Sequence, residues 1–199
     1  NWSVSNDLDY QGIFTNNDNV TIKNCALRNY DRIIRFKDGA DGLTFKDSNL
    51  TQFDYGFYGD NSRDTLVYNI TFFNTLGDAY VIYGDNISSY NISRNYFNGV
   101  HESLIENSFN VFYGSNVFYN ATNQFHFINV KTSTNITIDG FTMNLSDRAI
   151  RIGESIVNVF IKNGVIKDMF TDTDGYLAGI EIAGNRTNSS LNIRNLLIE

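Results

Sequence analysis

Apolar residues return along the chain at one spacing, eight times in 199 residues. An apolar residue is followed two positions later, usually by Asn, Asp or Gly, and three positions after that by a second apolar residue. The eight instances are Ile22-x-Asn24-x-x-Leu27, Phe45-x-Asp47-x-x-Leu50, Val67-x-Asn69-x-x-Phe72, Ile92-x-Arg94-x-x-Phe97, Phe112-x-Gly114-x-x-Val117, Ile138-x-Gly140-x-x-Met143, Ile161-x-Asn163-x-x-Ile166 and Ile193-x-Asn195-x-x-Ile198. A repeat of about 24 residues predicts a solenoid, in which each repeat stacks on the next.

The repeat at positions 43–64 indicates what one unit builds. Leu43 and Phe45 alternate with polar residues, which is the period of a half-buried strand. Asp47 interrupts the alternation, and Asp, like Asn and Gly, tolerates the left-handed backbone of a sharp corner. Leu50 begins a second short strand, and a third strand at positions 55–58 ends in the turn Gly59-Asp60-Asn61. Three strands and three turns per repeat are typical of a parallel β-helix coil.

The third strand also recurs, as Ile34-Arg35-Phe36, Phe57-Tyr58, Val81-Ile82-Tyr83, Leu104-Ile105, Phe125-His126-Phe127, Ile150-Arg151-Ile152 and Ile180-Glu181-Ile182. The sequence therefore predicts an all-β, single-stranded parallel β-helix of about eight coils, roughly 40 Å long at about 4.8 Å per coil. A leucine-rich repeat has a similar length, but Leu is sparse here and no window has helical periodicity.

The domain prediction is a single β-helix over residues 1–199. The eighth repeat breaks off in mid-turn, and solenoids need polar caps at their ends. We therefore expect a segment of a longer chain, with flanking domains or self-association through the open coil ends.

Composition narrows the class of protein. The chain has 42% apolar and 15% aromatic residues, enough to bury a core, together with 29 Asn and no Pro. Its net charge of −7, without a basic stripe, argues against a nucleic-acid partner. The sequence contains no run of 18 apolar residues, so it predicts no membrane-spanning helix.

Acceptor sites for N-glycosylation are frequent. Asn-x-Ser/Thr occurs eleven times, against roughly four or five expected by chance. The sites are Asn1, Asn19, Asn49, Asn69, Asn86, Asn91, Asn120, Asn135, Asn144, Asn185 and Asn188. The excess favours a glycosylated, extracellular or cell-surface protein; the alternative is that Asn at turns, followed by Thr in strands, creates such sites as a by-product of the fold.

The corner pattern resembles that of the pectate-lyase-like superfamily of right-handed parallel β-helices. The similarity is clearest in Ile22-Lys23-Asn24-Cys25-Ala26-Leu27 and Ile161-Lys162-Asn163-Gly164-Val165-Ile166, and covers about residues 10–199. It is greatest to the Asn-rich surface and periplasmic branch with carbohydrate-binding and sugar-hydrolysis repeats. The resemblance implies a right-handed helix with the corner Asn stacked from coil to coil. It leaves the activity open, because the superfamily contains lyases, hydrolases, tailspikes and adhesins.

Lyases of this superfamily hold Ca²⁺ with acidic clusters, and two groups of aspartates are candidates for such a site. Asp38, Asp60 and Asp85 follow equivalent third strands and could stack as a column of hard oxygen ligands. Asp172 and Asp174 lie in Thr171-Asp172-Thr173-Asp174-Gly175, inside the longest insertion. Both groups also fit ordinary turns and a solvated loop. No cofactor is required, and Ca²⁺ is the one ion that these residues suggest.

Candidate catalytic residues are few. His101, Glu102 and Glu106 lie in one coil, where a His beside carboxylates could transfer protons. The hydrolase motifs of the superfamily, including a paired Asp-Asp and a Gly-His-Gly, are absent. A solvated His at a turn is the simpler interpretation.

Candidate carbohydrate-binding residues lie on the third strands. Arg35, His126, Arg151 and Glu181 occupy the middle of apolar triplets, so alternation points them outward, although Arg35 and Arg151 are several coils apart. Aromatic residues cluster on successive coils at Tyr55, Phe57, Tyr58, Tyr80 and Tyr83. We expect most of these to pack inside, and any that face outward, with Tyr58 and Tyr83 as candidates, could lie against sugar rings.

The sequence thus predicts a secreted or cell-surface β-helix that serves as a rigid, non-catalytic scaffold or binding module for a polysaccharide or cell-surface glycan. A polysaccharide lyase or glycoside hydrolase is the first alternative. A viral tailspike or fibre segment is the second. Whether the protein is an enzyme stays open at this point, with the absence of a convergent acidic cluster favouring a binder.

Overall fold

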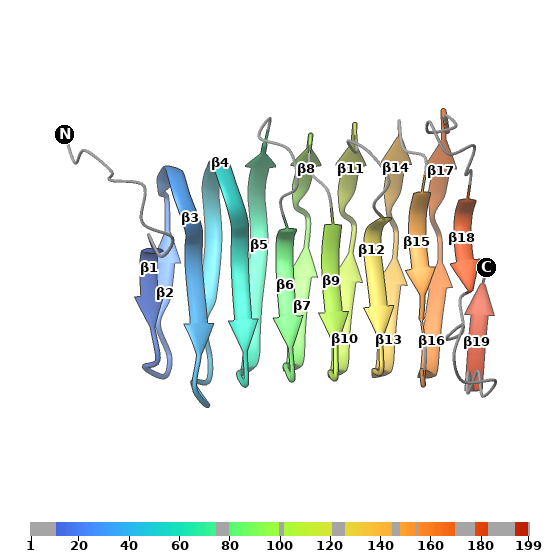
Figure 1. Ribbon diagram of the computed structural model, residues 1–199, viewed down its shortest axis with the longest axis horizontal. Coiled ribbons are helices and arrows are strands. Elements are labelled where there is room, and N and C mark those ends of the chain that lie inside the picture. Colours follow the sequence, from blue (N-terminus) through green and yellow to red (C-terminus); the bar gives the residue numbers. More distant parts are fainter. Residues whose placement is uncertain are drawn as a thin grey trace.

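The computed structural model describes residues 11–74, 80–99, 102–120, 126–144, 148–153, 155–169, 178–182 and 194–198. Within these residues the chain forms strands and turns only, and each strand pairs in parallel with its counterpart one coil away. Three parallel sheets result, and all three follow the long axis of the molecule (Figure 1). The predicted β-helix is confirmed.

The front sheet contains the third strand of each repeat. It is formed by β1 (Gln11–Thr15), the end of β3 (Ala26–Lys37), the end of β4 (Thr44–Asp60), β6 (Tyr80–Asp85), β9 (Glu102–Glu106), β12 (His126–Lys131), β15 (Arg148–Ile152) and β18 (Ala178–Ile182).

The rear sheet contains the first strand of each repeat. It is formed by β2 (Thr21–Lys23), the start of β4, β5 (Arg63–Phe73), β7 (Ser88–Ser93), β10 (Phe109–Gly114), β13 (Thr134–Asp139), β16 (Val157–Lys162) and β19 (Arg194–Ile198). The short sheet contains the second strand: the start of β3, the middle of β4, the end of β5, β8 (Tyr96–Asn98), β11 (Val117–Tyr119), β14 (Thr142–Asn144) and β17 (Val165–Lys167).

The helix is right-handed, as the resemblance implied. In Figure 1 the front strands run downward, the strands behind them run upward, and the coils advance from left to right. The stack amounts to about six turns, slightly fewer than the eight coils expected. β1 and β19 stand at the two ends of the stack without a complete coil around them in the described part of the chain.

Aromatic and aliphatic side chains from all three sheets fill the interior. Phe72, Phe97 and Phe118 lie on successive coils and stack with ring centroids 4.9 and 4.5 Å apart. Each is at most 1% exposed. This spacing follows from the strand separation of about 4.8 Å, because equivalent residues of parallel strands in register lie directly above one another.

Residues with positive φ form the corners. Asn24, Asp47, Asn69, Arg94 and Asn163 have φ between 51° and 56°, as the predicted left-handed corner requires. Gly140, at φ 63°, fills the same position in the sixth repeat.

Two of the eight predicted repeats have a different register. In the fifth, Tyr113 rather than Phe112 pairs with Ile92 and is buried, and the positive φ lies at Ser115 rather than Gly114. The ring of Phe112 lies across Gly114, where a Cβ would approach it to 2.3 Å, so this glycine makes room for an outward aromatic ring.

In the eighth repeat, Ile198 rather than Ile193 aligns with Ile161. Ile198 was expected one strand later, so β19 supplies only the first strand of this repeat. Ile193 lies outside the described residues.

The position immediately after the corner carries a second ladder that the sequence pattern did not reveal. Asn95 and Asn116 are both 1% exposed. The Oδ1 of Asn116 accepts the backbone N–H of Asn95 at 2.9 Å, and Asn95 Oδ1 accepts that of Ile70 at the same distance. These side chains satisfy backbone groups that turn into the core at the corner, where an unpaired N–H would be costly.

No helix in the described residues is long and apolar enough to cross a membrane.

Candidate functional site

The outer face of the front sheet carries four tyrosines on two neighbouring coils. Tyr55 and Tyr58 on β4 are in register with Tyr80 and Tyr83 on β6. Tyr58 stacks on Tyr83 with centroids 4.9 Å apart, and Tyr55 stacks on Tyr80 at 5.4 Å. The two stacked pairs meet edge to face, at 5.5 to 6.0 Å between centroids. We call these four residues the tyrosine platform.

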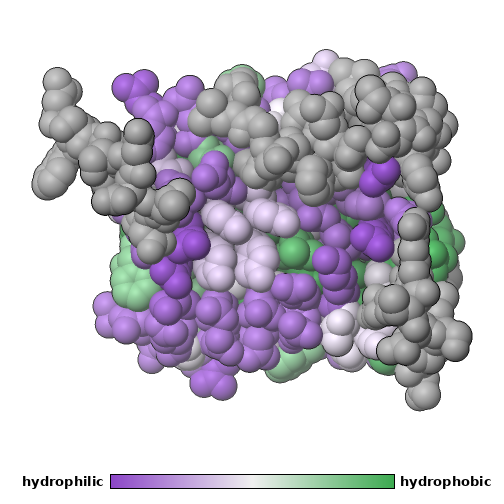
Figure 2. All heavy atoms as spheres, in the orientation of Figure 1, coloured by the Kyte–Doolittle hydropathy of each residue, from purple (hydrophilic) through white to green (hydrophobic). Residues whose placement is uncertain are grey.

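The platform lies outside the core, against the expectation that most of these aromatics would pack inside. All four rings are partly exposed, whereas Phe57, between Tyr55 and Tyr58, points inward and is fully buried. Figure 2 shows this face, with a pale patch over β4 and β6 and hydrophilic side chains below it. Strict alternation is broken here: Gly56 and Phe57 are both buried, so Tyr55 and Tyr58 on either side of them are both partly exposed.

Two arginines adjoin the platform on the coil before it. The guanidinium carbon of Arg32 lies 5.4 Å from the ring centroid of Tyr55 and 5.2 Å from that of Tyr58. Arg35 lies 5.5 Å from the Tyr58 centroid. These distances are within the range of cation–π contacts. Burial raises the pKa of the Tyr58 and Tyr83 phenols, and the hydrogen bond from Tyr83 to Glu106 raises the second further, so both remain neutral donors.

The platform continues along the helix axis as one row of outward residues. In register, the row runs Arg35, Tyr58, Tyr83, Leu104, Asn129, Arg151 and Glu181. Four of the five predicted carbohydrate-binding residues, Arg35, Tyr58, Tyr83 and Arg151, therefore share a row, and Arg35 and Arg151 are several coils apart as expected. The fifth, His126, lies on the neighbouring row in register with Arg148.

A cluster of buried polar groups follows the platform. Asn129 donates its side-chain N–H to Glu102 Oε1 at 2.6 Å, and both residues are at most 5% exposed. Burial raises the pKa of the Glu102 carboxyl, an effect that the hydrogen bond from Asn129 and the charges of Lys131 and Arg151 only partly offset. Asn129 Oδ1 is buried and has no hydrogen-bond partner among the residues that the structure describes.

The second half of this cluster is a His–Glu pair. His126 Nε2 lies 2.8 Å from Glu181 Oε2, across two coils, and His126 is 4% exposed. Burial lowers the pKa of His126, and the charges of Arg151 and Arg148 add to this, while Glu181 opposes it. Arg151 Nε lies 4.0 Å from Glu181 Oε1. We call Glu102, Asn129, His126, Arg151 and Glu181 the polar cluster.

Several residues of the polar cluster were candidates from the sequence, each for a different reason, but their proximity to one another was not predicted. Glu102 was expected to act with His101 and Glu106, but its partner is Asn129, 27 residues away. His101 lies outside the described residues. Glu106 instead accepts a hydrogen bond from Tyr83 at 2.9 Å. His126 was expected to point outward as a candidate carbohydrate-binding residue, and it is only 4% exposed. Asn129 was not singled out, because its contact depends on coil length rather than on a local motif.

The predicted aspartate column has a different composition. Asp60 and Asp85 are in register, but the residue aligned with them on the preceding coil is Lys37, not Asp38. The column continues with Glu106 and Lys131. Asp38 follows Lys37 at the next corner, where it adopts φ 64° and its carboxylate pairs with the Lys37 ammonium at 3.1 Å.

No group of three or more His, Cys, Asp or Glu suited to a metal ion occurs in the part of the chain that the structure describes. Asp172 and Asp174 lie outside that part. Calcium binding therefore stays a prediction.

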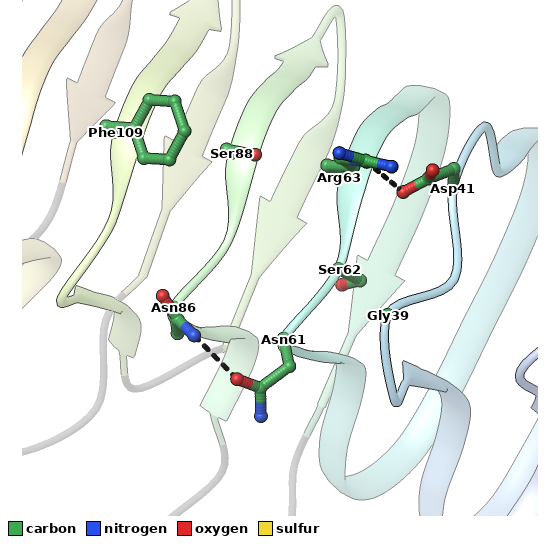
Figure 3. A pocket seen from close by; sticks show the side chains of 8 residues that line it. All are labelled: Gly39, Asp41, Asn61, Ser62, Arg63, Asn86, Ser88 and Phe109. Carbon is green, nitrogen blue, oxygen red and sulfur yellow. Dashed lines mark hydrogen bonds and ion pairs between the residues drawn. The ribbon is translucent and has the colours of Figure 1, made fainter.

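A pocket of about 500 Å³ opens at the corner between the front and rear sheets. Figure 3 shows Asn61 and Asn86 on its front-sheet side, Arg63 paired with Asp41 at one end and Phe109 at the other. Gly39, Ser62 and Ser88 complete its lining. We call it the corner pocket.

The structure sorts the possible glycosylation sites by the contacts of their amides. Asn69, Asn86 and Asn135 donate their side-chain N–H to Asp47, Asn61 and Asn110 in exposed corner ladders. Asn49 and Asn91 are exposed and lie within strands. Asn19 and Asn120 adopt positive φ, and Asn144 Oδ1 is buried. Asn1, Asn185 and Asn188 lie outside the described residues. Occupancy of these sites stays a prediction.

Comparison with solved structures finds similar chains at low sequence identity. One is the A-module of the mannuronan C-5 epimerase AlgE4 from Azotobacter vinelandii, 14% identical, with a TM-score of 0.48 over 90% of this chain and 62% of that chain. Another is the periplasmic alginate epimerase AlgG, 14% identical, with a TM-score of 0.31 over 84% of this chain and 61% of that chain. The present chain spans less than two thirds of each. No protein-family model matches the sequence, and no curated protein matches it.

Proposed function

We propose that the front sheet of this β-helix binds a carbohydrate chain at the tyrosine platform. The observation that carries the proposal is the platform itself: four tyrosines pack on one another on the solvent side of a sheet whose interior is already filled by other aromatics. Clustered aromatic surface that contributes little to the core is typical of an interaction site.

The chemistry of the platform suits a sugar better than a purely apolar partner. Each tyrosine combines an apolar ring with a hydroxyl, so it can contact the C–H groups of a sugar and hydrogen-bond to its hydroxyls. Arg32 and Arg35 add planar donors at one end, and Arg151 adds a further guanidinium along the same face. Because these groups repeat at the coil spacing along a straight axis, they fit a linear polymer lying along the front sheet.

Affinity electrophoresis of the protein through gels containing neutral or uronic-acid polysaccharides tests the proposal. Replacing Tyr58 and Tyr83 with Ala should abolish retardation by the polysaccharide that retards the wild type. The matched control is the Tyr96→Ala, Tyr119→Ala variant, whose tyrosines are 39% and 37% exposed on the short sheet. Equal loss of retardation in both variants, or no retardation of the wild type by any polysaccharide, would contradict a platform-specific function.

The polar cluster supports a second candidate, a polysaccharide lyase or hydrolase. Glu102 and His126 are buried titratable groups on the same face as the platform, and their pKa values are shifted toward the neutral form. A raised carboxyl pKa and a lowered imidazole pKa are shifts in the direction that a general acid and a general base require.

This candidate is tested by incubating the protein with the same polysaccharides, with and without Ca²⁺, and analysing the products by mass spectrometry. Unsaturated or water-added oligosaccharides from the wild type, absent with Glu102→Gln, would establish the enzyme. Unchanged polymers would leave binding without catalysis as the function of this face.

We infer an extracellular or cell-surface location for this activity. The inference is supported by the polysaccharide ligand proposed above and by the excess of N-glycosylation acceptors. Fractionation of the source cells, followed by immunodetection, tests it: recovery of the protein only from the cytosol would contradict it.

A further inference from the structure

The corner pocket owes its shape to one small residue in a row of large ones. Arg63, Ser88 and Phe109 are in register on β5, β7 and β10, and all three line the pocket. Arg63 has a side chain 63% exposed and Phe109 is 50% exposed, whereas Ser88 is 8% exposed. The hollow between the guanidinium and the ring therefore results from the small side chain of Ser88 and not from a gap between the strands (Figure 3).

Both hydrogen-bond acceptors and hydrogen-bond donors line this hollow. Asn86 donates its side-chain N–H to Asn61 Oδ1 at 2.6 Å, which fixes the amide and leaves Asn86 Oδ1 without a donor among the described residues. Asn107 donates to Asp85 rather than to Asn86, so this corner ladder is interrupted at the pocket. Arg63 donates through Nε to Asp41 Oδ1 at 2.5 Å, and the guanidinium has further N–H groups to offer a ligand.

The charges around Arg63 set the kind of ligand. Asp41 forms the ion pair, and Asp64 and Asp18 are close enough to raise the pKa of Arg63 further. Asp41 in turn has its pKa lowered by the hydrogen bond from Arg63, so it is ionised at neutral pH. Three carboxylates surround one guanidinium, which disfavours an anionic ligand.

We propose that the corner pocket binds one unit of a neutral sugar, with the apolar side of the sugar ring on Phe109 and its hydroxyls hydrogen-bonded to Asn86, Ser88 and Arg63. A flat apolar surface beside fixed donors and acceptors in a concave site is the general form of a small-molecule pocket. The pocket lies around the corner from the tyrosine platform and stands on its own residues. It can therefore exist whether or not the platform binds.

Saturation-transfer and ¹⁵N-chemical-shift NMR with cellohexaose, laminarihexaose and mannohexaose tests the site, with a galacturonic acid oligomer as the anionic probe. At least one neutral oligosaccharide should shift the resonances of Asn86 and Ser88, and the anionic oligomer should not. Phe109→Ala should weaken this binding about tenfold, the loss expected for one ring contact of moderate strength. Phe112→Ala is the matched control, because Phe112 is on the same strand, 37% exposed and outside the pocket.

Two further results separate this site from the platform. Ser88→Leu should fill the hollow and abolish the shifts at Asn86, with thermal unfolding measured to confirm folding. Tyr58→Ala with Tyr83→Ala should leave the shifts at Asn86 unchanged. The proposal is overturned if no neutral oligosaccharide shifts these residues at millimolar concentration, if the anionic probe does so instead, or if Phe112→Ala weakens binding as much as Phe109→Ala. Loss of platform binding alone would overturn only the function proposed for the front sheet.

Discussion

Two aromatic ladders in this protein share a geometry and differ in surroundings. Phe72, Phe97 and Phe118 stack inside the helix at 4.9 and 4.5 Å. Tyr58 and Tyr83 stack outside it at 4.9 Å, with a similar angle between the ring planes. The spacing is a property of the parallel coil and occurs on both sides of the sheet.

The difference lies in what each ladder excludes from water. The phenylalanines are fully buried, so their contribution to stability includes transfer from water and close packing on all sides. The tyrosines remain partly exposed and keep hydroxyls that bond to groups such as Glu106. The same stacking geometry therefore supports the fold in one place and leaves a surface available for a ligand in the other.

The largest effect on stability is expected from a substitution in the buried phenylalanine ladder. Phe97→Ala should lower the free energy of unfolding by about 3–5 kcal/mol, because it removes the middle ring of the buried stack and leaves a cavity between two coils. Urea denaturation measures the loss. Phe160→Ala, at a 37% exposed position, is the control and should cost far less. A loss from Phe97→Ala as small as that of the control would show that the interior stack is not the main stabilising element.

The two Asn ladders offer a polar version of the same comparison. Asn116→Ala should cost about 1–3 kcal/mol, because it leaves the buried N–H of Asn95 and the carbonyl of Ile92 without their partner. Asn135→Gly, in an exposed ladder at φ 58°, should change stability by no more than about 0.5 kcal/mol. Equal losses on thermal or urea unfolding would contradict the distinction between the ladders.

The outer tyrosines should affect stability less than the inner phenylalanines. Tyr58→Ala should lower the free energy of unfolding by about 1 kcal/mol, the value of one exposed aromatic contact. The urea midpoint, measured beside that of Phe97→Ala, gives the ratio directly. A loss as large as that of Phe97→Ala would mean that the platform belongs to the stabilising framework rather than to a binding surface.

The polar cluster predicts a pH dependence from His126. Because burial lowers its pKa below the ordinary 6.5, the unfolded imidazole binds a proton first as the pH falls. The stability present above pH 6.5 should therefore decline as the pH falls toward the pKa of the folded state. His126→Gln should flatten this part of a plot of melting temperature against pH, and an unchanged slope would contradict the burial argument.

Glu102 should give a pH dependence of stability opposite in sign to that of His126. Its pKa is raised above the ordinary 4.5, so its contribution is fully present below pH 4.5 and is lost as the pH rises through the pKa of the folded state. Glu102→Gln should remove that loss and raise the melting temperature at neutral pH relative to acid pH. Asp139→Asn, at a residue whose carboxylate pairs with Lys162 on the rear sheet, is the control that should not reproduce this pattern.

Local sequence was sufficient for the strands and most corners. Alternation predicted the inward residues of the first strands, and Asn24, Asp47 and Asn69 marked corners with positive φ because few residue types adopt that conformation at low cost. The fifth repeat was wrong by one residue, because Phe112 and Tyr113 are both aromatic and either could face the core. Pairing with Ile92 on the coil below selects Tyr113.

The candidate site depended much more on tertiary structure. Tyr58 and Tyr83 were recognised as possible surface residues, but the platform forms only because the two coils are in register. Glu102 meets Asn129 across 27 residues and His126 meets Glu181 across 55, distances in sequence that no short motif encodes. The corner pocket has no sequence signal beyond a serine in line with an arginine and a phenylalanine.

The sequence by itself determined that this chain is a parallel β-helix, since period-two alternation and left-handed corner residues are local properties of the backbone, and its right hand was implied only by the resemblance of the corners to those of known β-helices. The tertiary structure decided which side chains of successive coils meet. The physical reason is that coil lengths vary, so the register between neighbouring coils is chosen by packing of the core and by strand pairing along the whole stack. The tyrosine platform, the polar cluster and the corner pocket all follow from that register.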